Sequence, residues 1–206
     1  EDWEIQLSRA RQLTKSQQFA EADPLYQLLT TAAERFQFPL PLRAKVHNNY
    51  GSMLHAAARF AGAEAEYKLA IALWTRANGP ASGEHAITLN NLGEVYRRLG
   101  RPAAAEASYR ASLAMHEAVS TPDRLHYAAA LNNLATVLAP GPEPLAALEK
   151  SLRIKQELLG PRHPDVATTL NNLGSLHQNA GRSAAAEDCY RPALAIRETQ
   201  SPPDRP

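Results

Sequence analysis

The residues of this sequence best suited to do chemistry are asparagines that occur in adjacent pairs. The pairs recur at intervals of 42, 42 and 39 residues (90−48, 132−90 and 171−132). An asparagine amide offers two N–H donors and one carbonyl acceptor, so a row of amides can pair with the main chain of an extended peptide. The chemistry predicted from these residues is reversible peptide binding. The four pairs are Asn48-Asn49, Asn90-Asn91, Asn132-Asn133 and Asn171-Asn172.

Charged residues follow the second of the four pairs on the same side of a predicted helix. At about 100° per residue, Asn90, Glu94, Arg97 and Arg98 form a stripe opposite the apolar residues. Arg97 and Arg98, helped by Lys45, are suited to pairing with a carboxylate. We therefore expect the partner to be a protein or an extended peptide segment that carries acidic residues. Equivalent positions in the other copies complete the candidate groove: Asn48, Ser52, His55, Asn132, Thr136, Asn171, Ser175 and Gln178.

A packing role is the alternative for many of these residues. The second asparagines lie at the margin of the apolar arc, where a buried amide would hydrogen-bond a neighbouring helix or loop. The same alternative applies with less force to the first asparagines. Arg97 and Arg98 can equally belong to a solvated face. Asn48, Asn90, Asn132 and Asn171 are the asparagines that the pattern favours for ligand contact.

Catalytic and metal-binding patterns are missing from the sequence. The histidines include no pair separated by three or four residues, and the single cysteine, Cys189, adds no partner for a zinc site. Cys189 adjoins a tyrosine on a predicted packing helix, which favours a small packing residue over a nucleophile. There is no glycine-rich phosphate loop or nucleophile elbow. We therefore expect no enzyme, no metal and no cofactor.

The elements that position the asparagines are helices arranged as hairpins. In the copy from Thr88 to Glu117, apolar residues recur at steps of three and four, which is typical of an α-helix. Gly100-Arg101-Pro102 then stops the first helix, and Tyr109 lies on a second, alanine-rich helix. A tyrosine stands 19 residues after the first asparagine in three copies (67−48, 109−90 and 190−171). Each copy is therefore predicted to be a helix-turn-helix unit.

Hairpins of this size cannot bury both faces alone, so consecutive copies must stack. We expect an all-α, right-handed superhelical solenoid of about five repeats, forming one domain over residues 1–198. The first copy has Leu7-Ser8 in place of the asparagines and is predicted to act as a cap. The fourth has lost three residues at Pro140-Gly141-Pro142, so a tighter hairpin is expected there. The approximate repeats are 3–39, 44–78, 86–119, 128–159 and 167–198, and a polar, proline-rich tail follows at 199–206.

Several strings resemble the tetratricopeptide repeats of the kinesin light chain type. They are Leu-Asn-Asn-Leu-Gly at 89–93 and 170–174, Ala-Glu at 105–106 and 186–187, and His163-Pro164-Asp165-Val166-Ala167. The resemblance covers nearly the whole chain. It implies an adaptor whose concave face receives extended, often acidic, peptide segments, with the asparagine ladder contacting the peptide backbone. A sensor or oligomerisation domain of a larger multidomain regulator is the alternative function.

The balance of charged residues limits the classes of partner that the chain is expected to bind. Lys and Arg total 22 against 21 Asp and Glu, a formal net charge of +1, which favours neither nucleic acid nor a membrane surface as the partner. One cysteine and no apolar run of about 20 residues point to the cytoplasm. The chain starts at Glu1 without a methionine, which leaves a removed signal open.

The C-terminal end has features that the other repeats lack. Pro192 lies inside the last predicted helix, where it should kink or loosen the helix because it removes a backbone donor. The apolar edge near Leu173, Leu176, Leu194 and Ile196 is expected to be partly exposed. Self-association of two copies through this end is one expected consequence.

Overall fold

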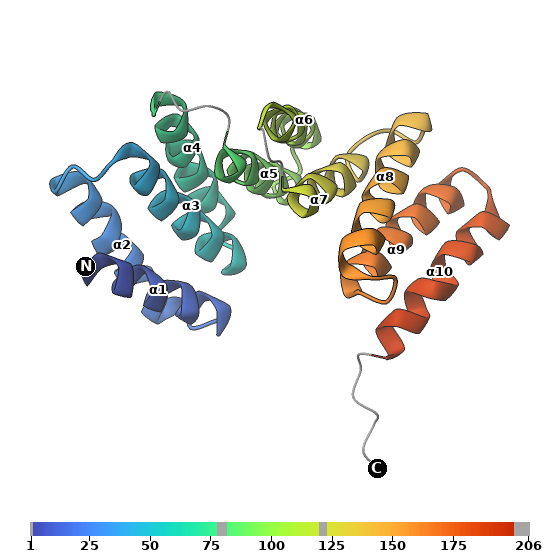
Figure 1. The fold of residues 1–206 in the computed structure, drawn as a ribbon, viewed down its shortest axis with the longest axis horizontal. Helices are drawn as coiled ribbons and strands as arrows, with labels where there is room; N and C mark the ends of the chain where they lie inside the picture. Colours follow the sequence, from blue (N-terminus) through green and yellow to red (C-terminus); the bar gives the residue numbers. More distant parts are fainter. Residues whose placement is uncertain (1, 78–81, 120–122, 200–206) are drawn as a thin grey trace, which may run out of the picture. The chain divides into compact units, whose positions relative to one another are not determined.

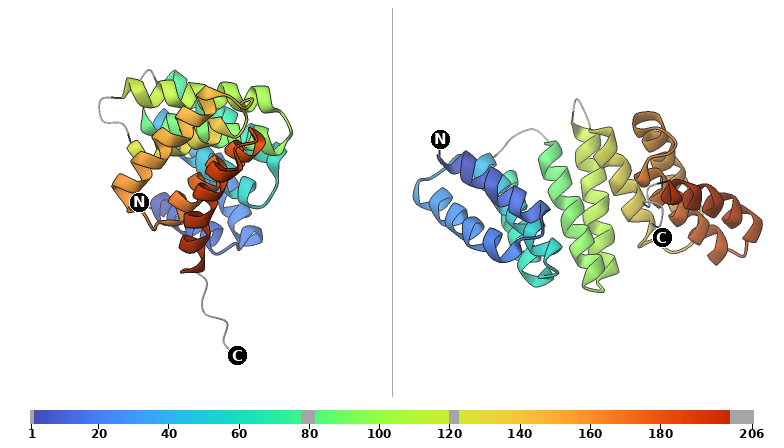
Figure 2. Two further views of the ribbon diagram at one scale, coloured as in Figure 1. Left: turned by 90° about the vertical axis from the view of Figure 1, so that its right-hand side faces the viewer. Right: turned by 90° about the horizontal axis from the view of Figure 1, so that it is seen from below.

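The computed structural model describes residues 2–77, 82–119 and 123–199, and these residues form ten α-helices without a strand (Figure 1). The helices follow one another as antiparallel pairs, as Figure 2 also shows. The all-α helical-repeat solenoid predicted from the sequence is therefore confirmed. The helices are α1 (Asp2–Lys15), α2 (Phe19–Arg35), α3 (Leu40–Ala56), α4 (Phe60–Arg76), α5 (Gly83–Arg98), α6 (Pro102–Ala118), α7 (Arg124–Ala135), α8 (Pro142–Leu159), α9 (Pro164–Asn179) and α10 (Ser183–Glu198).

Capping residues start α5 and α7 three and four residues before the predicted repeat bounds. Ser82 accepts a hydrogen bond from the His85 backbone N–H at the start of α5, and Asp123 accepts from the second and third residues of α7. Each cap satisfies a donor that the first turn would otherwise leave unpaired. The glycine-, proline- and asparagine- or aspartate-containing linkers predicted between repeats at 76–80 and 120–123 lie partly outside the described residues, as does most of the predicted tail (200–206).

The two helices of a hairpin meet where a glycine faces a tyrosine. Three residues after the first asparagine stand Gly51, Gly93 and Gly174, and a Cβ at Gly93 would lie only 2.5 Å from Cε1 of Tyr109. Tyr109 is fully buried. Because glycine has no side chain, the ring can press directly on the backbone of the first helix. The same contact recurs between Gly51 and Tyr67 and between Gly174 and Tyr190.

The hairpin turns share a left-handed residue ten positions after the first asparagine. Gly100 and Gly181 hold it with φ of 70° and 71°, as glycine does without strain. The second hairpin uses Ala58 at φ 57° instead, which costs a residue with a Cβ some energy. In the third hairpin the Arg101 N–H donates to the Tyr96 carbonyl at 2.9 Å, which closes the turn.

The fourth hairpin corrects one expectation. A tighter turn was predicted from the three missing residues, but α7 ends early, at Ala135, and residues 136–141 connect it to α8. The equivalent connection between α5 and α6 is residues 99–101. Pro140 and Pro142 explain the difference, because the residue before a proline avoids the helical region. The missing residues therefore shorten the helix and not the turn.

The chain divides into two compact units, residues 1–121 and 122–206. In unit 1, α3 contacts both α1 and α5, so the first helices of the three hairpins lie side by side. We call the surface of α1, α3 and α5 the inner face of unit 1. Its core runs through all three hairpins and includes Tyr26, Met53, Tyr67 and Val95.

Ion pairs join the hairpins of unit 1 at equivalent positions. Arg59, the residue before α4, binds Asp23 of the preceding hairpin at 2.7 Å, and Arg101, the residue before α6, binds Glu64 at 3.0 Å. Tyr50 also donates to Asp23 at 2.7 Å. These contacts fix how one hairpin sits on the next.

In unit 2 a buried lysine takes part in the packing of α8 on α9. Lys155 is only 6% exposed, and its Nζ donates to Thr169 Oγ1 at 2.9 Å. Nearby, Leu152 of α8 packs against Val166, Ala167 and Leu170 of α9. Burying the Lys155 ammonium without an opposite charge costs free energy, so this lysine makes the α8–α9 interface less stable than an apolar residue would.

Helix α10 continues through Pro192 as one helix, Ser183–Glu198. Of the predicted apolar edge, Leu194 is 59% exposed, whereas Leu173, Leu176 and Ile196 are buried. The expected exposure at this end is therefore limited to Leu194, since the other three side chains face the interior of the last hairpin.

Candidate peptide-binding face

Asn48 on the inner face of unit 1 is tied to the next hairpin. Its Oδ1 accepts from Thr88 Oγ1 of α5 at 3.1 Å, and the side chain is half-buried. One turn along α3, the Ser52 hydroxyl donates to the Asn48 carbonyl and accepts from Tyr67. Asn48 thus serves packing through its carbonyl oxygen. Asn90, at the equivalent place on α5, is also half-buried.

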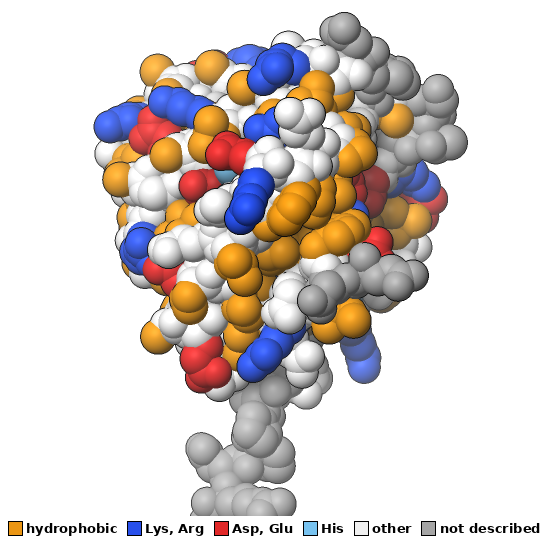
Figure 3. All heavy atoms as spheres, turned by 90° about the vertical axis from the view of Figure 1, so that its left-hand side faces the viewer, with side chains coloured by type: hydrophobic (Ala, Val, Ile, Leu, Met, Phe, Trp, Pro, Cys, Tyr) orange, Lys and Arg blue, Asp and Glu red, His pale blue; other side chains and the backbone are white. Residues whose placement is uncertain are grey.

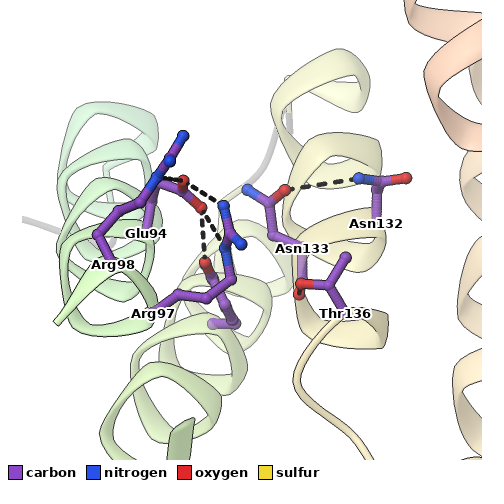
Figure 4. Close-up of polar contacts among 7 residues, drawn as sticks. Glu94, Arg97, Arg98, Asn132, Asn133 and Thr136 are labelled. Atoms are coloured by element: carbon purple, nitrogen blue, oxygen red, sulfur yellow. Dashed lines mark hydrogen bonds and ion pairs between the residues drawn. The ribbon is translucent and has the colours of Figure 1, made fainter. Parts of the chain in front are cut away.

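Glu94 gathers two arginines on α5, as Figure 4 shows. Arg97 binds it through two hydrogen bonds of 2.9 and 2.6 Å, and Arg98 through one of 3.0 Å. Burial would raise the pKa of Glu94, but the hydrogen bonds and charges of both arginines outweigh burial and lower it. The cluster keeps a positive charge, because one carboxylate faces two guanidinium groups. Both arginines are exposed and can reach a ligand.

Two other predicted residues border this cluster. Lys45 forms an ion pair with Glu84 at 3.3 Å, and both side chains are about half exposed. Such an exposed pair is worth little and can be exchanged for a ligand carboxylate. Burial, together with the arginine charges, lowers the pKa of His55 although Glu94 opposes this. His55 is therefore neutral near pH 7.

The first hairpin contributes cations that the sequence analysis did not select. Arg11 and Lys45 line a hollow of about 210 Å³ between α1 and α3, and Arg11 and Lys15 line an adjoining hollow of about 360 Å³ on α1. Among the ion pairs of the described residues, none involves Arg11 or Lys15. Arg11 aligns with Ser52 and Lys15 with Ala56 when the tyrosines are superposed. Because the first hairpin was predicted to act only as a cap, these two cations were not selected as candidate binding residues.

The N-terminal side of the molecule also exposes apolar side chains. Figure 3 shows a band of hydrophobic side chains there, with Lys and Arg side chains beside it. Ile5, Leu28 and Phe36 are 65%, 60% and 66% exposed. The hollow of Arg11 and Lys45 is itself lined by Trp3, Leu7 and Leu42, so a ligand bound there would meet both cationic and apolar groups.

In unit 2 the asparagines bond to one another. Asn132 is only 6% exposed, and its Oδ1 accepts from Asn172 of α9 at 3.0 Å. Figure 4 shows Asn132 directed toward Asn133 on the same helix, at 3.5 Å, with Thr136 exposed one turn further. For Asn132 the structure favours the packing alternative. The second asparagine Asn172 likewise packs, as its position at the margin of the apolar arc indicated.

The remaining predicted residues lie along α9. Asn171 is half-buried and borders a hollow of about 570 Å³ together with residues of α10. Ser175 and Gln178 are exposed, and Gln178 accepts a hydrogen bond from Tyr190 at 2.9 Å. These side chains share one face of α9, but cations comparable to those of unit 1 are missing from the predicted set here.

A larger hollow, about 870 Å³, lies on unit 1 away from the asparagines. It is lined by Trp74, Met115 and three alanines of α6, with Ser82 and His85 at the start of α5. Burial lowers the pKa of His85. Trp74 is half-buried at the edge of this hollow, and the helical spacing of the sequence gave no signal for it.

Two further properties of the described residues bear on function. No group of three or more His, Cys, Asp or Glu side chains is placed to hold a metal ion among them. Every helix in the described part of the chain is too short or too polar to cross a bilayer.

Comparison with known proteins gives a consistent family. A family model for the tetratricopeptide repeat matches residues 42–118, 84–139 and 144–199. No curated protein matches the sequence significantly. Among solved structures, BtubC (BKLC) from P. vanneervenii is 23% identical, with a TM-score of 0.79 over 96% of this chain and 81% of that one.

Two further solved structures share the fold. A Podosopora anserina protein with nearly identical TPR-like repeats, of the kinesin light chain type, is 18% identical, with a TM-score of 0.77 over 96% and 95% of the two chains. MamA is 17% identical, with a TM-score of 0.63 over 92% and 94%. The hairpins, the repeated Gly–Tyr contacts and the family model together show that the chain belongs to the tetratricopeptide repeat family, and its fold is similar to that of a protein of the kinesin light chain type.

Proposed function

We propose that the chain is a protein-binding scaffold that holds an extended, acid-containing peptide segment on the inner face of unit 1. Repeats of this fold serve in general as protein-interaction scaffolds. The observation that carries the finer proposal is the row of cations along the three first helices: Arg11 and Lys15 on α1, Lys45 on α3, and Arg97 and Arg98 on α5.

The balance of charge on this face supports an acidic ligand. Glu84 and Glu94 are already held by Lys45 and by the two arginines of α5. A third carboxylate, Glu4, lines the hollow of Arg11 and Lys45, so the cations still outnumber the carboxylates. Within the described part of the chain, Arg11 and Lys15 form no ion pair, and they line hollows where a carboxylate would gain charge-assisted hydrogen bonds. The amide N–H groups of Asn48, which is half-buried and bonds to Thr88 through its oxygen, would supply hydrogen bonds to the ligand backbone.

The test is a peptide-library selection against the wild-type chain and against an Arg97→Gln/Arg98→Gln variant, with the fold of both checked by circular dichroism. We expect the wild type to enrich extended peptides with Asp and Glu, and the variant to lose much of this enrichment. An Arg9→Gln/Arg35→Gln variant changes the net charge equally at exposed sites outside the hollows and serves as control. Equal enrichment of acidic peptides by all three proteins would contradict the proposal that the inner face of unit 1 binds them.

The second candidate is an assembly domain of a larger regulator. The observation that favours it is the exposed Leu194 on α10. In that case substitutions on α10 would change assembly, and substitutions on the inner face of unit 1 would not.

A further inference from the structure

The outer side of α10 carries the same features that bind successive hairpins inside each unit. Leu194 occupies the position of Ile71 and Leu152, and each of these packs partly buried against the next hairpin. Arg197 occupies the position of Lys155, which bonds to Thr169 of the next hairpin. On α10 these positions are exposed instead.

Acidic residues repeat in the same way. Glu187 stands at the position of Asp23 and Glu64, whose carboxylates bind an arginine of the following hairpin at 2.7 and 3.0 Å. Glu187 itself pairs with Arg191 on its own helix at 2.6 Å, with both side chains more than two-thirds exposed. An exposed pair of this kind contributes little and can rearrange on binding.

We propose that this surface of α10 binds the α10 of a second copy of the chain in an antiparallel, twofold-symmetric pair. We define the α10 stripe as Glu187, Tyr190, Leu194 and Arg197, which lie on one side of the helix and border one hollow of about 570 Å³. This proposal is independent of peptide binding on unit 1.

The order of residues makes the stripe complementary to itself. Glu187 and Arg197 stand five residues to either side of position 192, and Tyr190 and Leu194 stand two residues to either side. In an antiparallel pair centred there, residues at equal distances on either side of the centre face each other, because both helices rise about 1.5 Å per residue. Glu187 of each copy then faces Arg197 of the other, and Tyr190 of each copy faces Leu194 of the other, so that every contact occurs twice.

The other end of the chain is a poorer occupant of the same surface. At the α1 positions that pack on a preceding hairpin elsewhere, Arg9 and Gln12 replace the apolar pairs Tyr50 and Met53, or Leu92 and Val95. Gln18 stands before α2 where Arg59 and Arg101 stand before α4 and α6, so no arginine is available there for Glu187. The pairing of two α10 helices keeps both ion pairs, whereas stacking α10 on α1 loses them.

The contact is small, so the dimer should be weak. One helix of 16 residues on each side buries less than the roughly 1,200–2,000 Å² typical of stable complexes. Sedimentation equilibrium over a wide concentration range is therefore the suitable measurement, and dimer should accumulate only at the upper end of that range.

The decisive test uses charge reversal. Glu187→Arg or Arg197→Glu alone should weaken dimerisation about tenfold or more, because symmetry places each reversed charge opposite a like charge twice. Mixing the two single variants should restore association as a heterodimer, and the double variant should dimerise like the wild type. Asp188→Arg, an exposed change on the other side of α10, and Ile5→Arg on α1 should have no effect.

Three results would overturn the proposal. The first is a wild-type chain that stays monomeric up to its solubility limit. The second is dimerisation that Glu187→Arg leaves unchanged. The third is association that Ile5→Arg abolishes, since it would show stacking of α10 on α1.

Discussion

Replacing Gly93 with alanine tests whether the Gly–Tyr contact sets the position of α5. A Cβ at this site would lie 2.5, 2.7 and 3.0 Å from three carbons of the Tyr109 ring, well inside the usual carbon–carbon contact of about 3.5–4.0 Å. Tyr109 is fully buried and cannot swing into solvent. Forcing extra volume into such a site costs about 1–3 kcal/mol. The better helix propensity of alanine returns about 1 kcal/mol.

Gly83→Ala is the matched control, because an added Cβ there has no atom within 4 Å. The two variants should therefore differ by about 1–3 kcal/mol in the free energy of unfolding, with Gly93→Ala the less stable. Urea denaturation followed by circular dichroism measures this difference. The cost should shrink in a Tyr109→Leu background, since the fourth hairpin combines Ala135 with Leu148 at these positions. The reasoning is refuted if Gly93→Ala stabilises the chain as much as Gly83→Ala.

Three other substitutions test separate parts of the structure. Ala58→Gly should raise the free energy of unfolding by about 1 kcal/mol, because glycine adopts the left-handed turn conformation without strain; a decrease in the urea midpoint would contradict this. Burial raises the pKa of Asp23, but hydrogen bonds from Tyr50 and Arg59 outweigh it and hold the pKa below 3.8, so its stabilising effect is present above that pH and lost as the pH falls further. Asp23→Asn should therefore flatten the acid dependence of the urea midpoint, and an unchanged profile would show that the pair contributes nothing. Burial lowers the pKa of Lys155 although Asp165 opposes this, so stability should rise as the pH approaches 10.5. Lys155→Met should remove that rise and leave the chain at least as stable near pH 7, and a large loss of stability would show that the Thr169 bond matters more than the buried charge.

The fold could be predicted from the sequence because the residues that form the helix–helix contact of a hairpin recur at the same spacing in several copies. Three glycines and three tyrosines at fixed spacing mark the place where the helices of a hairpin touch. Helix starts were less accessible, since Ser82 and Asp123 lie before the apolar pattern begins and act through side-chain caps. The shortened α7 was missed because spacing alone does not say whether a deletion falls in a turn or in a helix.

The candidate site was harder to predict than the fold. A helical wheel places Asn132 on an open face, but it cannot show that Asn172 of the next hairpin lies 3.0 Å away and covers it. Lys45 and Glu84 come from neighbouring first helices, so their pairing also depends on how hairpins stack. Arg11 and Lys15 were missed because the candidate residues were selected by their spacing from an asparagine pair, and the first hairpin has no such pair. Its first helix nevertheless lies beside α3, which in turn lies beside α5.

The most direct test of the central claim is a binding titration with one selected acidic peptide, followed by fluorescence anisotropy at fixed ionic strength. We expect Arg11→Gln/Lys15→Gln to weaken binding about tenfold, because two charge-assisted contacts are removed without disturbing a core residue. The control Arg9→Gln/Arg35→Gln, with the same change in net charge, should bind like the wild type. Equal affinities for all three proteins, or equal losses in both variants, would contradict a specific binding site on the inner face of unit 1.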